Sequence, residues 1–308
     1  VTCVVSDKEG VLWIGTQGGA ARLSDKTWSL RHGRRWLASD NVRDIAFDAG
    51  GNAWVGTDTG VSVIRRKTMT LAEKAVHFEK VTNERHVRAP WIVELCGLEK
   101  PGRVDSWKPR DDDNDGQYTA MYLAMESFRY AATKDPDARE SARRAFDALA
   151  FLREVTGTAG FVARTVIPAD WTTMADPNED VSDQEWADRQ IADPRDKRVA
   201  ALWRLSADGK WRWKGDTSSD EITGHFYAYP LYYDLAADDS ARERVRDHVR
   251  RVMDYIMDNG HVLLDIDNAP TRWGVWAPEM LNDDPDWQPD RGTNSVEILS
   301  YLKSAWHI

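Results

Sequence analysis

The sequence contains only two cysteines and no long apolar segment, and each absence excludes a class of protein. Cys3 and Cys96 are too few for a disulfide framework and have no metal-ligand spacing. No run of about 18 apolar residues occurs, so we expect no membrane span, and no basic stretch leading into an apolar one marks a signal peptide. Also missing are the dinucleotide fingerprint, the P-loop, the nucleophile elbow and the His-Glu-x-x-His zinc motif.

Positive charge is scarce in the larger part of the chain. The 308 residues carry a formal net charge of -10. Residues 1–110 hold 18 Lys and Arg against 13 Asp and Glu, whereas residues 111–308 hold 23 against 38. An acidic surface repels a phosphate backbone, so we expect no nucleic-acid partner.

Tryptophan, in contrast, is abundant. Fifteen are present, eleven of them after residue 90. An indole ring on a surface needs something flat to stack on and a partner for its N–H, and sugars supply both. Core packing is the alternative for any single tryptophan, but their number favours a poly- or oligosaccharide partner.

An offset of 41 residues aligns the start of the chain with itself. Residues 1–16 lie over residues 42–57, and both segments contain Asp-x-x-Gly followed by Trp-x-Gly-Thr. Each unit is predicted to form three short strands joined by glycine-bearing turns. We expect two adjacent blade-like sheets in which Trp13 and Trp54 take equivalent buried positions.

At these residues the sequence resembles the two-component-regulator propeller repeat, whose signature is Asp-x-x-Gly-x-(Leu/Ala)-Trp-(Ile/Val)-Gly-Thr. The resemblance covers residues 1–67 and implies a β-propeller. Two blades cannot close a ring, because propellers typically have about four to eight. We therefore expect missing flanking sequence or a neighbouring subunit to complete the propeller.

After residue 67 the spacing of apolar residues becomes helical. Thr70 and Glu73 form a capping box in front of an apolar stripe made of Leu71, Ala75, Phe78 and Val81. Further helices are predicted over 115–134, 137–155, 218–237, 240–259 and 292–307. Hairpins are predicted where Trp203-Arg204-Leu205 can pair with Trp211-Arg212-Trp213 and where residues 262–266 can pair with 271–276.

Helix pairs joined by loops rich in polar and aromatic residues are typical of an α/α toroid. Residues 68–308 resemble the toroids of glycoside hydrolases, polysaccharide lyases and sugar epimerases, with β-hairpin insertions. The expected fold class is α+β and multidomain: a partial β-propeller of two blades over 1–67, then an α/α toroid-like helical domain over 68–308. The predicted helices are too few to complete a toroid, so we expect the chain to be truncated at both ends.

An acidic run directly precedes the helix predicted from residue 115. Asp111, Asp113 and Asp115 have the alternate spacing that opens a calcium loop, although Tyr122 stands where an EF-hand has its bidentate Glu. A partial calcium site on these three residues is one interpretation. The other is that Asp112, Asp113 or Asp115 projects into a sugar-binding cleft, where crowded carboxylates raise one another's pKa and keep a general acid protonated.

A second cluster lies at the helix predicted from residue 218. Serines at the expected N-cap precede Asp220 and Glu221. Glu221 and His225 are four residues apart and share one helix face, so they could act as an acid–base pair or could simply cap and solubilise the helix. Gly224 beside His225 indicates that something approaches this face closely.

A third group lies on and after the hairpin predicted over 262–276. Arg272, Trp273 and Trp276 could form one wall of a sugar site, with Arg272 gripping a uronate carboxylate and Glu279 close by. A packed hairpin with the arginine stacked on tryptophan is the alternative. Because both acidic clusters begin a helix, we expect them to face one cleft lined by Trp273 or Trp276.

Together these clusters favour a carbohydrate-active protein. The expected mechanism is glycoside hydrolysis by two carboxylates, with Asp113 and Glu221 as first candidates and Asp115, Asp220 and His225 as further acid–base groups. A uronate lyase or epimerase on the same fold would use His225 or a tyrosine as base and Arg272 as the carboxylate clamp. A non-catalytic extracellular sensor, glycan-binding protein or structural assembly protein is the third alternative. We expect a periplasmic or extracellular location, with calcium as the one candidate cofactor.

Overall fold

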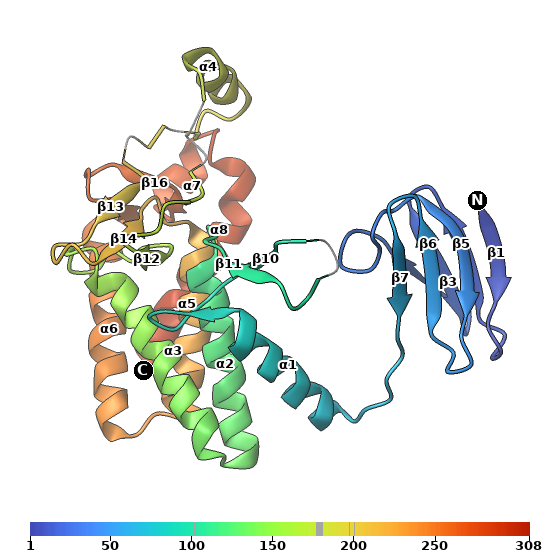
Figure 1. The fold of residues 1–308 in the computed structure, drawn as a ribbon. Coiled ribbons are helices and arrows are strands. Elements are labelled where there is room, and N and C mark those ends of the chain that lie inside the picture. Colours follow the sequence, from blue (N-terminus) through green and yellow to red (C-terminus); the bar gives the residue numbers. More distant parts are fainter. Residues whose placement is uncertain (101–102, 177–180, 197, 200) are drawn as a thin grey trace. The chain divides into compact units, whose positions relative to one another are not determined.

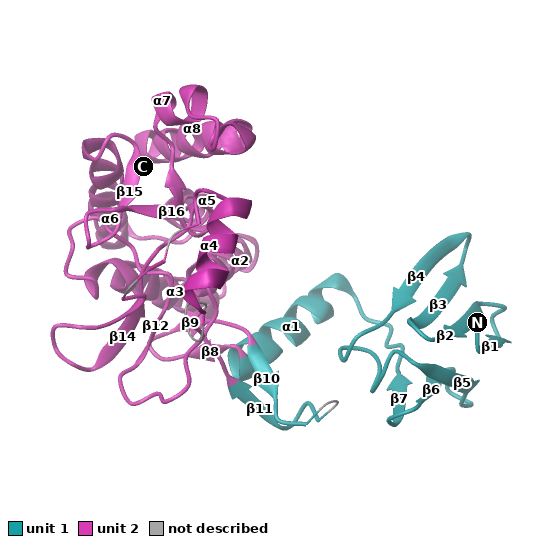
Figure 2. Cartoon of the chain, turned by 90° about the horizontal axis from the view of Figure 1, so that it is seen from above, with its two compact units in different colours: residues 1–85, 96–108 teal, residues 86–95, 109–308 magenta. Residues whose placement is uncertain are grey.

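The computed structural model describes residues 1–308 except 101–102, 177–180, 197 and 200 (Figure 1). The chain divides into two compact units, residues 1–85 with 96–108 and residues 86–95 with 109–308 (Figure 2). It is a mixed α+β protein with helices and several small sheets. Within the described residues, no helix combines the length and the apolar character that crossing a membrane requires.

Two antiparallel sheets open the first unit. The first sheet contains β1 (Cys3–Ser6), β2 (Leu12–Thr16), β3 (Gly19–Ser24) and β4 (Thr27–Arg31), in chain order. The second contains β5 (Val42–Phe47), β6 (Ala53–Thr57) and β7 (Val61–Ile64). One apolar core joins the two sheets and contains Val11, Trp13, Ala20, Leu37, Val42, Ile45, Ala53, Val55 and Ile64.

The residues shared by the two repeats make the same contacts in both sheets. Asp7 and Asp48 each accept a backbone N–H from across the first turn, at 2.9 and 3.0 Å. Thr16 and Thr57 each donate to a glycine carbonyl across the second turn, at 2.7 and 2.8 Å. The repeat with its offset of 41 residues is therefore present in the structure as well as in the sequence.

The expectation that Trp13 and Trp54 take equivalent buried positions is wrong. Trp13 is 3% exposed, whereas Trp54 is 45% exposed. Trp13 faces the second sheet, where its ring meets that of Phe47 edge-on at 6.1 Å. In β6 it is Ala53 and Val55 that enter the shared core, so Trp54 between them points to the opposite face of the sheet.

The helix α1 (Leu71–Arg85) starts at the predicted capping box. The Thr70 backbone N–H donates to Glu73 Oε2 at 2.7 Å, and the Glu73 N–H donates to Thr70 Oγ1 at 3.1 Å, which confirms the predicted start. The apolar stripe, however, is not covered. No residue of α1 is buried, and Leu71 is 86% exposed.

The second unit is mainly helical. Its long helices are α2 (Asp115–Thr133), α3 (Pro136–Glu154), α5 (Ser219–Leu235), α6 (Asp239–Asp258) and α8 (Arg291–His307). All five match the predicted bounds to within two residues. Three shorter elements were not predicted: α4 (Asp183–Ala192), α7 (Pro278–Asp283) and the 3-10 turn η1 (Gln288–Asp290).

Small sheets accompany these helices. A three-stranded sheet has the order β12 (Val166–Pro168), β14 (Trp211–Lys214), β13 (Trp203–Leu205), and the predicted hairpin of β13 and β14 is confirmed. The hairpin of β15 (Val262–Leu264) and β16 (Pro270–Val275) is confirmed as well. The pair of β8 (Val87–Arg88) and β9 (Ile92–Val93) also belongs to the second unit, whereas β10 (Cys96–Leu98) and the paired β11 (Trp107–Pro109) lie mainly in the first unit.

Helices α2 and α5 lie side by side, with α3 and α6 returning alongside them (Figure 1). Glycine makes the close approach of α2 and α5 possible. A Cβ on Gly224 would lie 2.7 Å from Gln117 Cγ and 3.0 Å from Gln117 Cα. The interpretation of Gly224 as a point of close approach is therefore confirmed, and the starts of α2 and α5 are brought together.

Candidate functional site

The site is built where α2 and α5 begin. The Gln117 backbone N–H in the first turn of α2 donates to Glu221 Oε2 in the first turn of α5, at 2.9 Å. Gly116 leaves room for this contact, because a Cβ there would lie 2.3 Å from Glu221 Oε2 and 2.9 Å from His225 Nε2. The structure thus brings the second predicted cluster against the start of the helix that follows the acidic run.

Asn114 links the two acidic clusters. With its amide nitrogen turned toward the neighbouring acceptors, Asn114 donates to Asp220 Oδ2 at 3.3 Å and to the Asp113 carbonyl at 3.2 Å. Asp220 also contacts the Ser218 hydroxyl and is only half-buried. The residue that follows Asp113 therefore contacts Asp220 directly and ties the start of α2 to the start of α5.

Glu221 and His225 are completely buried. Burial raises the pKa of Glu221 well above its ordinary value and lowers the pKa of His225 to about 3. Burial therefore favours the protonated form of Glu221, and His225 is neutral at neutral pH. Because Oε2 of Glu221 accepts the Gln117 N–H, its proton belongs on Oε1. Within the described residues neither Glu221 Oε1 nor His225 Nε2 has a hydrogen-bond partner.

Asp115, the first residue of α2, is also completely buried. Its Oδ2 accepts from Arg88 Nη2 at 3.0 Å, from Thr165 Oγ1 at 2.6 Å and from the Asp112 N–H at 3.2 Å. Burial raises the pKa of Asp115 to about 7, and the Arg88 guanidinium opposes that rise. Arg88 further pairs with buried Glu94.

Asp113 differs from its neighbours because its side chain is 45% exposed. Lys214 Nζ, itself buried, lies 2.5 Å from Asp113 Oδ1, and Arg164 Nη1 lies 3.9 Å from Oδ2. Partial burial raises the pKa of Asp113, but Lys214 and Arg164 outweigh it and the net pKa is lowered. Trp203, partly exposed, places its ring 5.2 Å from Lys214 Nζ.

The three residues of the predicted calcium site face donors and cations of the protein itself. Asp111 accepts the Ala175 N–H at 3.0 Å, Asp111 Oδ2 and Asp113 Oδ1 lie 3.9 and 2.5 Å from Lys214 Nζ, and Asp115 faces Arg88. In the part of the chain that the structure describes, no group of three or more His, Cys, Asp or Glu side chains could hold a metal ion. Because α2 begins at Asp115, the chain turns into a helix before it can wrap around a cation.

Arg272 is not free to grip a substrate carboxylate. Its backbone N–H and its Nε donate to the two oxygens of Asp216, at 2.9 and 2.5 Å, and its Nη1 donates to Asp196 at 3.2 Å. These two partners lie far away in the sequence. The predicted uronate clamp is therefore occupied by carboxylates of the protein itself.

The predicted aromatic wall of Trp273 and Trp276 is not formed. Trp276 is 1% exposed and donates Nε1–H to Glu297 Oε2 at 2.9 Å, so it is a core residue. Trp273 is half-buried beneath the guanidinium of Arg195, 5.1 Å from its ring. Glu279 is exposed in the first turn of α7.

The positively charged side chains of this site were not predicted from the sequence. Lys214, Arg164 and Arg88 are all buried and each contacts one of the acidic residues at the start of α2. Trp203, the partly exposed ring beside Lys214, was also not predicted as a site residue. The sequence does contain one indication of Lys214, because this residue ends a strand that is followed closely by α5 and its acidic cluster.

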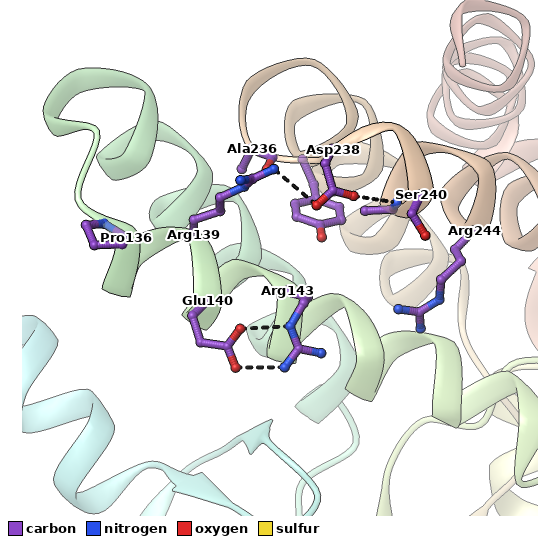
Figure 3. A pocket seen from close by; sticks show the side chains of 10 residues that line it. Pro136, Arg139, Glu140, Arg143, Ala236, Asp238, Ser240 and Arg244 are labelled. Carbon is purple, nitrogen blue, oxygen red and sulfur yellow. Dashed lines mark hydrogen bonds and ion pairs between the residues drawn. The ribbon is translucent and has the colours of Figure 1, made fainter.

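A separate pocket of about 340 Å³ lies where α3 and α6 begin (Figure 3). Arg139 pairs with Asp238 at 3.2 Å, and Arg143 makes two contacts with Glu140, at 2.7 and 2.8 Å. These charged groups satisfy one another. None of the sequence-predicted site residues lines this pocket.

Comparison with known proteins reaches only the start of the chain. The family model described as two component regulator propeller matches residues 1–18. The chain matches no curated protein and no solved structure significantly.

Proposed function

We propose that this protein acts on carbohydrate and hydrolyses a glycosidic bond with two carboxylates, Asp113 and Asp220. One observation supports the proposal: an ionised, half-exposed Asp113 stands at the start of α2, and the next residue, Asn114, donates to half-buried Asp220 at the start of α5. An ionised carboxylate beside a buried lysine can attack an anomeric carbon or activate water. Of the candidate acids at the start of α5, Asp220 is the one that a substrate can touch.

The start of α5 also carries a second carboxyl group, that of Glu221, whose protonated form is favoured by burial. Glu221 follows Asp220 in the first turn of α5, and its complete burial raises its pKa. In the proposed reaction Asp220 is the general acid and gives its proton to the leaving oxygen, while ionised Asp113 attacks the anomeric carbon or activates water. Glu221, Asp115 and His225 act in this proposal as positioning groups, since their side chains are closed off from solvent.

Trp203 is the proposed stacking platform. It is partly exposed and adjoins Lys214, which in turn contacts Asp113, so a sugar ring stacked on the indole would lie near the ionised carboxylate. This assignment replaces Trp273 and Trp276, which the structure uses for packing. Arg272 no longer has a substrate-binding role in the proposal, because its N–H groups already donate to Asp216 and Asp196.

We also propose that the second unit is toroid-like and that the first contains propeller-like blades. The antiparallel helix pairs α2–α3 and α5–α6, with α2 beside α5, support a toroid-like arrangement in the second unit. The repeated sheets, together with the family match over residues 1–18, support propeller-like blades over residues 1–67. A polymeric sugar substrate would place the protein in the periplasm or outside the cell.

The experiment incubates the full chain with neutral and acidic polysaccharides and measures new reducing ends. Asp113→Asn and Asp220→Asn should abolish their formation, while Asp267→Asn, on an exposed turn, should leave it unchanged. Absorbance from unsaturated uronates would identify a lyase instead. Binding without cleavage would identify a glycan-binding protein, an alternative that the complete burial of Glu221 and His225 favours. If the protein neither cleaves nor binds any of these polysaccharides, the proposed carbohydrate partner is wrong.

A further inference from the structure

An unbroken chain of buried hydrogen bonds joins three helices of the second unit. His225 Nδ1 lies 2.6 Å from the Tyr229 hydroxyl, both on α5, and that hydroxyl lies 2.7 Å from His248 Nε2 on α6. On α3, Arg153 Nε donates to His248 Nδ1 at 3.2 Å. The chain runs from Arg153, which is near the surface, to the candidate site at His225.

The chemistry of arginine fixes the position of every proton along this chain. A guanidinium only donates, so Nδ1 of His248 must accept, and a neutral His248 then carries its proton on Nε2. That N–H donates to the Tyr229 oxygen, and the Tyr229 hydroxyl donates to His225 Nδ1. His225 is left with its proton on Nε2, because the bond made by one ring nitrogen decides the state of the other.

Both imidazoles stay neutral at physiological pH. Burial lowers the pKa of His225 to about 3 and lowers the pKa of His248 well below its ordinary value. Arg153, Arg244 and Asp247 are the charged groups that act on His248; the two arginines lower its pKa further and Asp247 opposes them. Neutral rings keep one accepting and one donating nitrogen each, as the chain requires.

We infer that Arg153 is a positioning residue of the candidate site: acting through His248 and Tyr229, it fixes His225 as the neutral tautomer with its proton on Nε2. A guanidinium on one helix thereby sets a hydrogen-bond donor at the start of another. The donor is permanent, because arginine does not lose its charge in the pH range of a folded protein.

Two neutral donors then meet beside Gly116. His225 Nε2–H and the protonated Oε1 of Glu221 both lack a partner within the described residues. An unpaired buried polar group is costly, and both side chains are closed off from solvent, so this pair fits an enclosed water molecule that offers an acceptor oxygen. The tautomer assignment does not depend on the proposed function.

The test measures the tautomers directly on the full chain labelled with 15N-histidine. Long-range 1H–15N correlation spectra distinguish a protonated from an unprotonated ring nitrogen, and His225→Gln and His248→Gln serve only to assign the signals. We expect both rings to carry a single proton on Nε2 at pH 7. A proton on Nδ1 of His225, or on both of its nitrogens, would overturn the inference even if carbohydrate cleavage were found.

Variants test whether Arg153 is the cause. Arg153→Met keeps the apolar stem and removes the donor, so both rings should lose their single tautomer, whereas Arg144→Met on the same helix should change neither. Unchanged tautomers in folded Arg153→Met would overturn the assignment. If that variant does not fold, Tyr229→Phe decides: His225 should lose its fixed tautomer while His248, still held by Arg153, keeps its own. An unchanged His225 would again contradict the inference.

Discussion

Lys214 Nζ lies 2.5 Å from Asp113 Oδ1, so a buried cation is in contact with the one half-exposed carboxylate of the acidic run. Lys214 lowers the pKa of Asp113 against the effect of partial burial. This contact separates Asp113 from Asp115, whose pKa burial raises to about 7. Both acids face a cation, but Asp115 is buried more completely, so burial raises the pKa of Asp115 whereas Lys214 and Arg164 lower that of Asp113.

Replacing this lysine should protonate Asp113 at a higher pH. In Lys214→Met the burial of Asp113 is no longer offset by the ammonium group, so its pKa should rise and hydrolysis at pH 7 should fall by roughly tenfold or more. A 13C-NMR titration of the Asp113 carboxyl measures the shift independently of activity. Lys210→Met, on the exposed turn of the same hairpin, is the matched control. An unchanged titration of Asp113 would contradict the assigned role of Lys214.

Gly116 should not tolerate a methyl group. Alanine usually stabilises a helix by about 0.8–1 kcal/mol relative to glycine. Here the added Cβ would lie 2.3 Å from Glu221 Oε2 and 3.2 Å from the Arg164 carbonyl, so we expect Gly116→Ala to destabilise the protein by about 1–3 kcal/mol. In the first turn of α8, Gly292→Ala meets nothing within 4 Å and should be neutral or stabilising. Urea unfolding followed by far-UV circular dichroism measures both, and equal effects would contradict the close packing.

Local signals were enough to predict the helices and hairpins. Asp135 and Asp238 cap the starts of α3 and α6 by accepting backbone N–H groups two and three residues ahead, at 3.0 and 2.9 Å, so the residue that begins each helix stands next to it in the sequence. Spacing also indicated that Glu221 and Gly224 belong to a crowded helix start, because both lie within one turn of α5. It was therefore predictable that the site lies where two helices begin.

The partners of the site residues were not predictable, because they come from distant segments. Arg272 is occupied by Asp216, 56 residues away, and Trp276 is held by Glu297, 21 residues away. Nothing next to either residue reveals that its donors are already satisfied. Trp54 shows the same limit, since an identical repeat motif leaves it on the uncovered face of its sheet while Trp13 is buried.

Calcium should not stabilise the protein. Lys214 Nζ lies within 4 Å of both Asp111 and Asp113, and Asp115 pairs with Arg88, so cations of the protein already neutralise these carboxylates. A ligand that binds only the native state raises its melting temperature, so we expect equal Tm values in millimolar calcium and in a chelator. A calcium-dependent rise that Asp113→Asn abolishes would contradict this expectation and restore the calcium-loop interpretation.

The protonated state of Glu221 predicts how stability depends on pH. The folded protein keeps this proton because burial raises the pKa of Glu221, whereas the unfolded chain releases it above the ordinary value of 4.5. The folded state then binds more protons than the unfolded state, so the contribution of Glu221 to stability is fully present below about pH 4.5 and is lost as the pH rises toward its raised pKa.

Glu221→Gln removes that dependence, because the amide keeps the volume of the side chain and does not titrate. The free energy of unfolding of the wild type, relative to this variant, should fall by on the order of 1 kcal/mol per pH unit as the pH rises above 4.5 toward the raised pKa of Glu221. Urea unfolding of both proteins at each pH, followed by the helical signal of the second unit, measures the difference. Glu279→Gln, at the exposed start of α7, is the matched control, and its curve should run parallel to that of the wild type. If the Glu221→Gln curve also runs parallel, Glu221 is ionised in the folded protein and the proton it is assigned in the site is absent.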